Sequence, residues 1–323
     1  MNFFKLYFKL IIQILFISII FNCANAKNSS KFYKGGRISN YFSGILSLNQ
    51  NDYQHSYKFL KQLNGLEENH SNYSQSYLFS LVNLEKINEA FRYSKKLELK
   101  KIDSFESNLI IGIYYLKNEQ PELAAKYFEK NFKNNVKGSL KEYLSYSLFY
   151  WSTFHKINYS KAKILLGSAD KKFNSIAKIQ NIFMHCYYSH RSTEQNFKNL
   201  FAEKEIDYSR YKFFYSNYLH LKGEINTAKK VIEQSLDSHP KNLIIKKKKI
   251  DFDLKKDNDF ENKFNCKNAS NVMAELFYIT ANLLSSQAAY SVSNFYLNLA
   301  MYLNPNFISY KTLYAENFYS AEN

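Results

Sequence analysis

Residues 221–240 read LKGEINTAKKVIEQSLDSHP, and three of them predict a pair of antiparallel helices. Gly223 suits the turn between the helices, because glycine tolerates the left-handed backbone that such a turn needs. Ala228 is small enough to let two helix axes approach, and Pro240 ends the second helix because it cannot continue the hydrogen-bond ladder. The stretch therefore predicts one helix-turn-helix unit.

The spacing of small or close-packed residues indicates that this unit is repeated. Two sets of positions recur at one constant interval: Gly44, Leu78 and Gly112 form the first, and Ser56, Ala90 and Ala124 form the second. The shared interval, about 34 residues, is typical of stacked helix pairs, each of which buries its apolar face against a neighbour. The sequence therefore predicts an all-α repeat protein.

Residues 111–130, IGIYYLKNEQPELAAKYFEK, carry a resemblance to a known family. Gly112, Tyr115, Ala124 and Phe128 occupy the glycine, tyrosine, alanine and phenylalanine positions of the tetratricopeptide pattern. The chain resembles the tetratricopeptide repeat (TPR) family, and in particular its exported, largely uncharacterised bacterial members. The resemblance covers nearly all of the chain after its first three dozen residues, and it implies a solenoid wound as a right-handed superhelix. Seven units are expected, centred on Ser56, Ala90, Ala124, Ala162, Asn196, Ala228 and Ser293, with Pro305 supporting the last.

The repeat pattern also divides the chain into parts. We expect a flexible segment over 27–38, a block of about six repeats plus an extra helix over 39–257, and a polar linker over 258–270. A further unit and an incomplete repeat follow over 271–323. A helix starting at Asn306 has no following helix to cover it, whereas solenoids normally end in a polar cap. A longer natural protein, a partner over this end, or a shortened reading frame would each account for the missing cap.

The N-terminal stretch, residues 1–26, resembles a secretory signal peptide. Lys5 and Lys9 precede an apolar run over 10–21, and an Ala-x-Ala sequence ends at Ala26. We expect cleavage after Ala26 and export to the bacterial periplasm, because the apolar run is short for a membrane span. The alternative is an uncleaved segment that anchors the protein in the inner membrane, since residues 3–8 could lengthen the apolar stretch.

The chain is strongly basic. Its formal net charge is +16, and loss of the predicted signal peptide, which holds two lysines and no acidic residue, lowers this to +14. Such a charge attracts anionic lipid headgroups or acidic proteins, so the basic surface is one way in which the protein could contact a membrane. Nucleic acid is not expected as the partner of an exported protein. The joint abundance of Lys, Asn, Ile, Tyr and Phe also fits an AT-rich coding sequence, so charge alone assigns no function. The run Lys246–Lys249 is interpreted as a solvated helix face.

The resemblance also implies an inner wall of the superhelix. If its mainly apolar side chains are exposed, they form a groove for an extended or helical peptide. In a tight superhelix the same side chains would fill the interior. The predicted groove residues are Tyr41, Ile45, Leu48, Phe79, Val82, Leu109, Ile113, Leu116, Trp151, Phe154, Phe213, Asn217 and His220. The Asn, Lys and Arg set of a terminal-carboxylate clamp is missing from the corresponding positions, so apolar recognition is expected.

Catalytic residues, cofactor sites and metal sites are not expected. The eight glycines form no phosphate-binding loop or nucleophile elbow. His185, Cys186 and His190 come closest to a ligand cluster, with Cys186 and His190 one helical turn apart. Two ligands do not define a site, and ordinary helix packing is the expected role. The alternating acids over 257–261 lack the glycine and closing glutamate of a calcium loop.

Cys186 and Cys266 remain after the predicted export, and an oxidising compartment permits a disulfide. We nevertheless expect two unpaired thiols. Several packed helices, each adding about 8 to 10 Å, would lie between the two cysteines, whereas a bridge needs alpha carbons within about 7 Å.

Together these observations predict a non-enzymatic scaffold or adaptor of the cell envelope that binds a protein or peptide in the concave groove. One alternative is a membrane-anchored envelope assembly factor that retains residues 1–26. Another is a truncated fragment of a longer repeat protein, whose activity lies outside this chain. A decayed fragment without function is the last.

Overall fold

A computed structural model describes residues 35–167, 171–203, 205–254 and 264–322 of the chain. The chain divides into two compact units, residues 1–40 and 41–323. The predicted signal peptide and nearly all of the predicted segment over 27–38 lie outside the described residues, as do the acids over 257–261.

Helices account for all of the regular secondary structure in the described ranges, which confirms the all-α prediction. These ranges hold sixteen α-helices and two short 3-10 helices, and neighbours along the chain pack mostly in adjacent pairs. The earlier helices are α2 (Gly35–Asn49), α3 (Tyr53–Lys61), α4 (Ser71–Asn83), α5 (Ile87–Leu99), α6 (Phe105–Lys117), α7 (Pro121–Asn134), α8 (Leu140–Thr153), η1 (Phe154–Lys156) and α9 (Tyr159–Gly167). The later ones are η2 (Lys171–Phe173), α10 (Asn174–Tyr187), α11 (Thr193–Ala202), α12 (Ser209–Leu221), α13 (Ile225–Ser238), α14 (Leu243–Asp253), α15 (Ala269–Ser285), α16 (Tyr290–Leu303) and α17 (Tyr310–Glu322).

The turns within helix pairs recur at the interval seen in the sequence. In one such turn the Lys86 N–H donates to the Leu81 carbonyl at 2.8 Å, the six-residue closure of a Schellman motif. This closure needs a residue with left-handed backbone. Five such residues fall in two series that keep the sequence interval: Asn51, Glu85 and Glu119 at φ of 58°, 58° and 59°, then Ser189 and Gly223 at 51° and 82°. The helix pairs therefore form a repeat in the backbone as well as in the sequence.

Close helix contacts recur at the small residues of the repeat. A Cβ atom added to Gly44 would lie 2.6 Å from the Leu60 side chain, and one added to Gly112 would lie 2.4 Å from the Phe128 ring. Both glycines meet the residue sixteen positions later, and the two contacts are two repeats apart. The small residues at the second position of the repeat are fully buried: Ser56, Ala90, Ala124, Ala162, Ala228 and Ser293.

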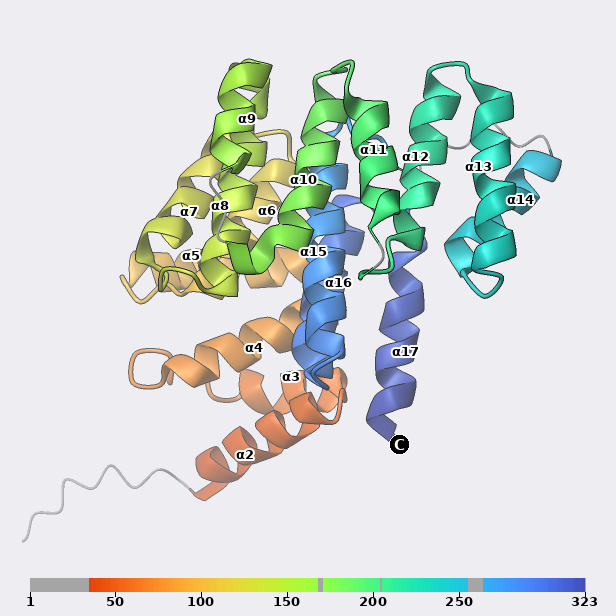
Figure 1. Cartoon of the computed structure of the whole chain (residues 1–323). Helices are drawn as coiled ribbons and strands as arrows, with labels where there is room; N and C mark the ends of the chain where they lie inside the picture. The colour runs from red at the N-terminus through yellow and green to blue at the C-terminus, as the bar shows by residue number, and fades with distance from the viewer. Residues whose placement is uncertain (1–34, 168–170, 204, 255–263, 323) are drawn as a thin grey trace, which may run out of the picture. The chain divides into compact units, whose positions relative to one another are not determined.

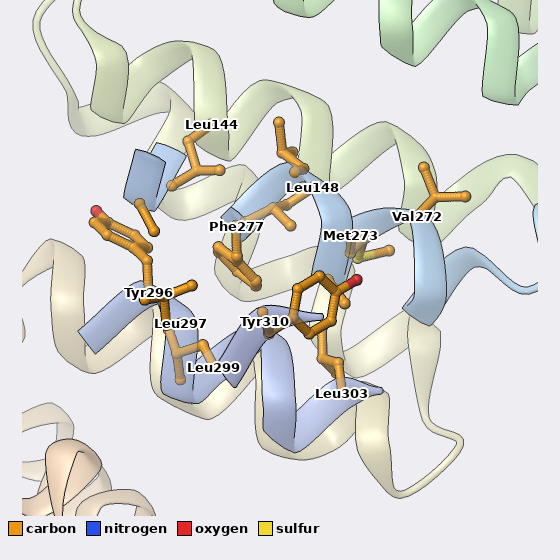
Figure 2. Close-up of a cluster of buried hydrophobic side chains, with 14 of the residues drawn as sticks. Leu144, Leu148, Val272, Met273, Phe277, Tyr296, Leu297, Leu299, Leu303 and Tyr310 are labelled. Carbon is orange, nitrogen blue, oxygen red and sulfur yellow. The ribbon is translucent and has the colours of Figure 1, made fainter. Parts of the chain in front are cut away.

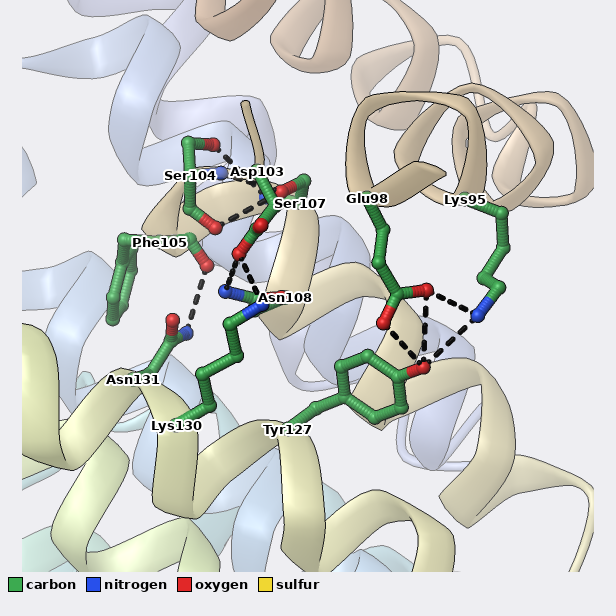
Figure 3. A network of polar contacts seen from close by, with 10 residues as sticks. All are labelled: Lys95, Glu98, Asp103, Ser104, Phe105, Ser107, Asn108, Tyr127, Lys130 and Asn131. Atoms are coloured by element: carbon green, nitrogen blue, oxygen red, sulfur yellow. Dashed lines mark hydrogen bonds and ion pairs between the residues drawn. The ribbon is translucent and has the colours of Figure 1, made fainter. Parts of the chain in front are cut away.

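Polar side chains link the second helix of one pair to the second helix of the next. The Tyr57 hydroxyl donates to Glu89 at 3.1 Å, across 32 residues of chain. Lys95 and Glu98 of α5 both bond to the hydroxyl of Tyr127 on α7 (Figure 3). These contacts hold successive pairs in a fixed register.

The hairpin of α15 and α16 does not simply extend this series. Helix α16 contacts α4 and α6, and α15 contacts α8 and α10, all of which lie far earlier in the chain. Figure 1 labels these helices, and Figure 2 shows side chains of α8, α15 and α16 gathered in one buried cluster. Helix α17 packs against both helices of the hairpin. The interior of residues 41–323 is thus built around the C-terminal hairpin.

Candidate functional site

The structure places most of the predicted groove residues in the interior. Val82, Leu109 and Ile113 are fully buried, and Trp151 and Phe154 each keep only 1% exposure. Leu48, Phe79, Leu116, Phe213 and Asn217 are also buried, whereas Tyr41, Ile45 and His220 are partly exposed. This face is therefore not an open apolar groove in the structure.

The C-terminal helices cover this face. The ring of Phe295 on α16 lies 4.6 Å from the ring of Phe79, and the ring of Phe307 lies 5.5 Å from that of Phe213. Helix α16 is buried on nearly all sides, with every residue from Ser293 to Ala300 in the interior. A helix of this kind needs protein on all sides. The repeat pattern of the sequence predicts a separate C-terminal unit here and does not predict this covering.

Buried amides fix the position of α16 against the earlier helices. Asn83 of α4 donates to the Ser291 carbonyl at 3.1 Å and accepts from Asn298 at 3.1 Å. Asn294 donates to the hydroxyl of Tyr53 at 2.6 Å. Because an unpaired buried amide is costly, these bonds favour one placement of the hairpin over a shifted one.

A buried ion pair holds α15 to α12. Two nitrogens of Arg210 donate to the two carboxylate oxygens of Glu275 at 2.8 and 2.9 Å, and a third donates to Ser309 at 2.8 Å. The guanidinium also lies 3.7 Å from the centre of the Tyr278 ring. Burial opposes the charge of both partners: it raises the pKa of Glu275, while the neighbouring carboxylate keeps the pKa of Arg210 above its usual value. Nothing in the sequence joins these two residues, which stand 65 positions apart.

A disulfide joins Cys186 to Cys266, so the prediction of two unpaired thiols is wrong. The alpha carbons are 5.9 Å apart, within the range of a bridge. The prediction assumed that helices stack in chain order, but the segment before α15 returns to α10 and brings the two cysteines together. Disulfides persist in oxidising compartments outside the cytoplasm, and this one points to such a location.

His185 and His190 come together in the turn between α10 and α11. Their Nδ1 atoms are 3.3 Å apart, and the Ser192 hydroxyl lies 2.9 and 2.8 Å from them. Burial, with smaller effects of His190 and Lys163, lowers the pKa of His185 to about 4. Cys186 is not part of this cluster, because it belongs to the disulfide. Among the described residues, no three His, Cys, Asp or Glu side chains gather to hold a metal ion.

Two cavities lie where the α15–α16 hairpin meets the turns and ends of the earlier helices. We call this region the seam. One cavity of about 360 Å³ lies between the α4–α5 turn and the end of α16, and another of about 550 Å³ lies between the ends of α6 and α8 and the start of α15. Lys117, at the end of α6, lines both cavities. This site cannot be predicted from the repeat pattern, because its walls come from helices that lie far apart in the chain.

None of the described helices is both long enough and apolar enough to cross a membrane. No protein-family model matches the chain, and a search of curated proteins finds no relative. The likeness to tetratricopeptide repeats therefore rests on the residues and the helix-pair geometry described above.

Proposed function

We propose that this protein is a TPR-type solenoid that acts as a non-enzymatic interaction scaffold or adaptor in the bacterial cell envelope, with a protein or peptide as its partner. The observation that carries the proposal is the recurrence of left-handed turn residues at the repeat interval, with a small buried residue at six of the seven predicted unit centres. Stacked helix pairs of this kind are typical of proteins that bind other chains along an extended surface.

The place of action follows from the disulfide and the leader-like N-terminus. The pairing of Cys186 with Cys266 supports folding in an oxidising compartment, and the stretch 1–26 supplies an export signal. A periplasmic location, reached after cleavage behind Ala26, is consistent with both the disulfide and the export signal. The covered face of α4, α6, α8 and α10 already holds one helical hairpin, so a partner would bind at its rim or replace that hairpin.

Affinity capture tests the proposal. The full mature chain is immobilised and exposed to envelope extract of the source organism, with a basic protein of similar charge as the control. Because a charge of +14 retains acidic proteins by electrostatics alone, the beads are washed at about 0.5 M salt, where surface charges are screened within a few ångströms. Specific proteins retained after this wash would support a scaffold. Retention of the same set on both supports would refute it.

A further inference from the structure

The seam between the hairpin and the repeats has the size of a ligand site. Its two cavities, about 360 and 550 Å³, fall within the range of pockets that hold small molecules or peptide side chains. Both are bounded by Lys117, so this one ammonium stands at the boundary between them. A ligand that fills both cavities must pass Lys117.

Apolar residues form part of the wall of each cavity. The smaller one is lined by Ile87, Met301, Tyr302 and Pro305. The apolar part of the larger one consists of Leu116, Trp151, Tyr187 and Leu303, and polar residues that include Ser152, His155 and Asn268 complete its lining. The smaller cavity therefore suits an apolar side chain, and the larger one offers an apolar side chain a surface that also holds polar groups.

Lys117 has few partners for its charge. Its ammonium donates to the Leu303 carbonyl at 3.4 Å and lies 5.8 Å from the centre of the Tyr302 ring. In the described part of the chain, no carboxylate lies within ion-pairing distance of it. Loss of water around the ammonium lowers its pKa, which is the sign of a charge that is incompletely compensated.

The surrounding charges favour an anion. Lys311 joins Lys117 in lining the smaller cavity, and Lys267 joins it in the larger one. Each cavity also contains one carboxylate, Glu85 or Glu119, so lysines outnumber carboxylates at the seam. The chain as a whole carries the same sign of charge.

We propose that this seam binds an extended peptide segment in which one carboxylate side chain reaches Lys117 and an apolar residue enters the cavity on each side. The proposal rests on the proposed scaffold function and names the chemistry of its partner. Space on both sides of Lys117 favours an acidic side chain within a peptide over a terminal carboxylate, because a chain end would fill one side only. In an extended chain, residues two apart point the same way, so an apolar-x-acidic-x-apolar pattern matches the seam.

Fluorescence anisotropy with a defined probe tests this proposal. The probe is a fluorescein-labelled pentapeptide amide, Leu-Ala-Glu-Ala-Leu, and the matched probe has Gln in place of Glu. The oxidised mature chain should bind the Glu probe about tenfold more tightly than the Gln probe, the range expected of one charge-assisted hydrogen bond. Lys117→Gln should weaken binding of the Glu probe about tenfold and remove the difference between the two probes.

Lys126→Gln is the matched control. Lys126 is an exposed lysine on α7 that lines neither cavity, so both probes should bind this variant as they bind the unaltered chain. Equal binding of the two probes by the unaltered chain, failure to bind either, or an unchanged preference in Lys117→Gln would overturn the proposal. So would tighter binding of a Leu-Ala-Leu probe with a free carboxyl end. If Lys117→Gln still captures the same salt-resistant envelope proteins as the unaltered chain, the seam proposal fails and the scaffold proposal stands.

Discussion

At the scale of single residues, the repeat depends on where small side chains meet large ones. The contacts of Gly44 with Leu60 and of Gly112 with Phe128 occupy equivalent places two repeats apart. In the repeat between them, Leu78 and Ser94 stand at these two places, and both are fully buried. The large and small partners are thus exchanged, which explains how leucine is tolerated at a position that holds glycine in both neighbouring repeats.

Gly112→Ala tests this size rule. The added methyl would come within 2.4 Å of the Phe128 ring, so we expect the free energy of unfolding to fall by about 1 to 3 kcal/mol despite the better helix propensity of alanine. Gly167→Ala is the control, because nothing lies within 4 Å of the new Cβ, and its stability should stay level or rise. Phe128→Leu should recover part of the loss in a Gly112→Ala background. Urea unfolding followed by circular dichroism measures all three, and equal effects at the two glycines would contradict the rule.

At the left-handed turn residues, substitution by glycine is expected to stabilise the fold. Ala288, in the turn between α15 and α16, has a φ of 57°, a conformation that costs an alanine about 1 kcal/mol and costs glycine almost nothing. Ala288→Gly should therefore raise the free energy of unfolding by about 0.5 kcal/mol after the entropy of glycine is deducted. The same substitution at Ala315, an exposed residue inside α17, should lower it by about 1 kcal/mol. Denaturant melts measure the free energy of unfolding of both variants. A change in the same direction at both positions would contradict the left-handed geometry of Ala288.

His185 links stability to pH. An unfolded histidine takes up its proton near pH 6.5, whereas the folded His185 does so near pH 4, so the unfolded state binds more protons between these values. Stability should therefore fall as the pH is lowered from 7 toward 4, by at most about 2 kcal/mol at pH 5, because solvent screening reduces the full effect. His185→Gln should remove this part of the dependence. Unfolding midpoints in urea at pH 7 and pH 5 give the comparison, and an unchanged slope in the variant would exclude His185 as its source.

At the scale of elements, the sequence predicts the helix pairs well and their long-range partners poorly. Periodic small residues such as Ala90 and Ala124 mark helix contacts because those contacts are local and recur at a fixed interval. The left-handed turns escape notice at Glu85 and Glu119, where glutamate replaces the usual glycine. The packing of α15 against α8 and α10 produces no periodic pattern in the sequence, because these contacts occur only once in the described part of the chain.

The same reason explains the error about the disulfide. A count of intervening helices places Cys186 and Cys266 far apart, and it is valid only for a chain that never turns back. The candidate seam escapes prediction in the same way, because Lys117 meets residues near 300 only when α16 lies against α6. Single exposed lysines are common on a basic chain and carry no signal of their own.

The disulfide makes a prediction about the attachment of α15. It closes a loop of 80 residues, for which loop entropy alone corresponds to about 4 kcal/mol of stability. Replacing both cysteines with serine should lower the melting temperature and speed hydrogen exchange at the start of α15. Reducing agent should have the same effect on the unaltered chain and none on the variant. An intact-mass increase of about 2 Da on reduction would show that one bridge is present, since breaking a disulfide adds two hydrogens.

At the scale of the whole molecule, the hairpin decides whether residues 41–323 unfold repeat by repeat or together. A plain array of repeats has only nearest-neighbour contacts, and losing its last units shortens it without exposing its middle. Here α16 touches α4 and α6, and α15 touches α8 and α10, so the ends and the middle of the unit share one interior. This arrangement favours one cooperative transition over a gradual one.

Truncation separates these two behaviours. A chain that ends at Leu254 lacks the hairpin, so α4, α6, α8 and α10 lose their contacts with it and Phe79 loses the ring of Phe295. Because the exposed surface is apolar, this chain should bind anilinonaphthalene sulfonate strongly and melt at a lower temperature over a broader range. A chain that ends at Leu303 keeps the hairpin and loses only α17, so its dye binding should rise far less. Should the shorter chain instead melt as sharply as the full one and leave the dye unbound, the hairpin would be an accessory to the repeats and not the centre of their packing.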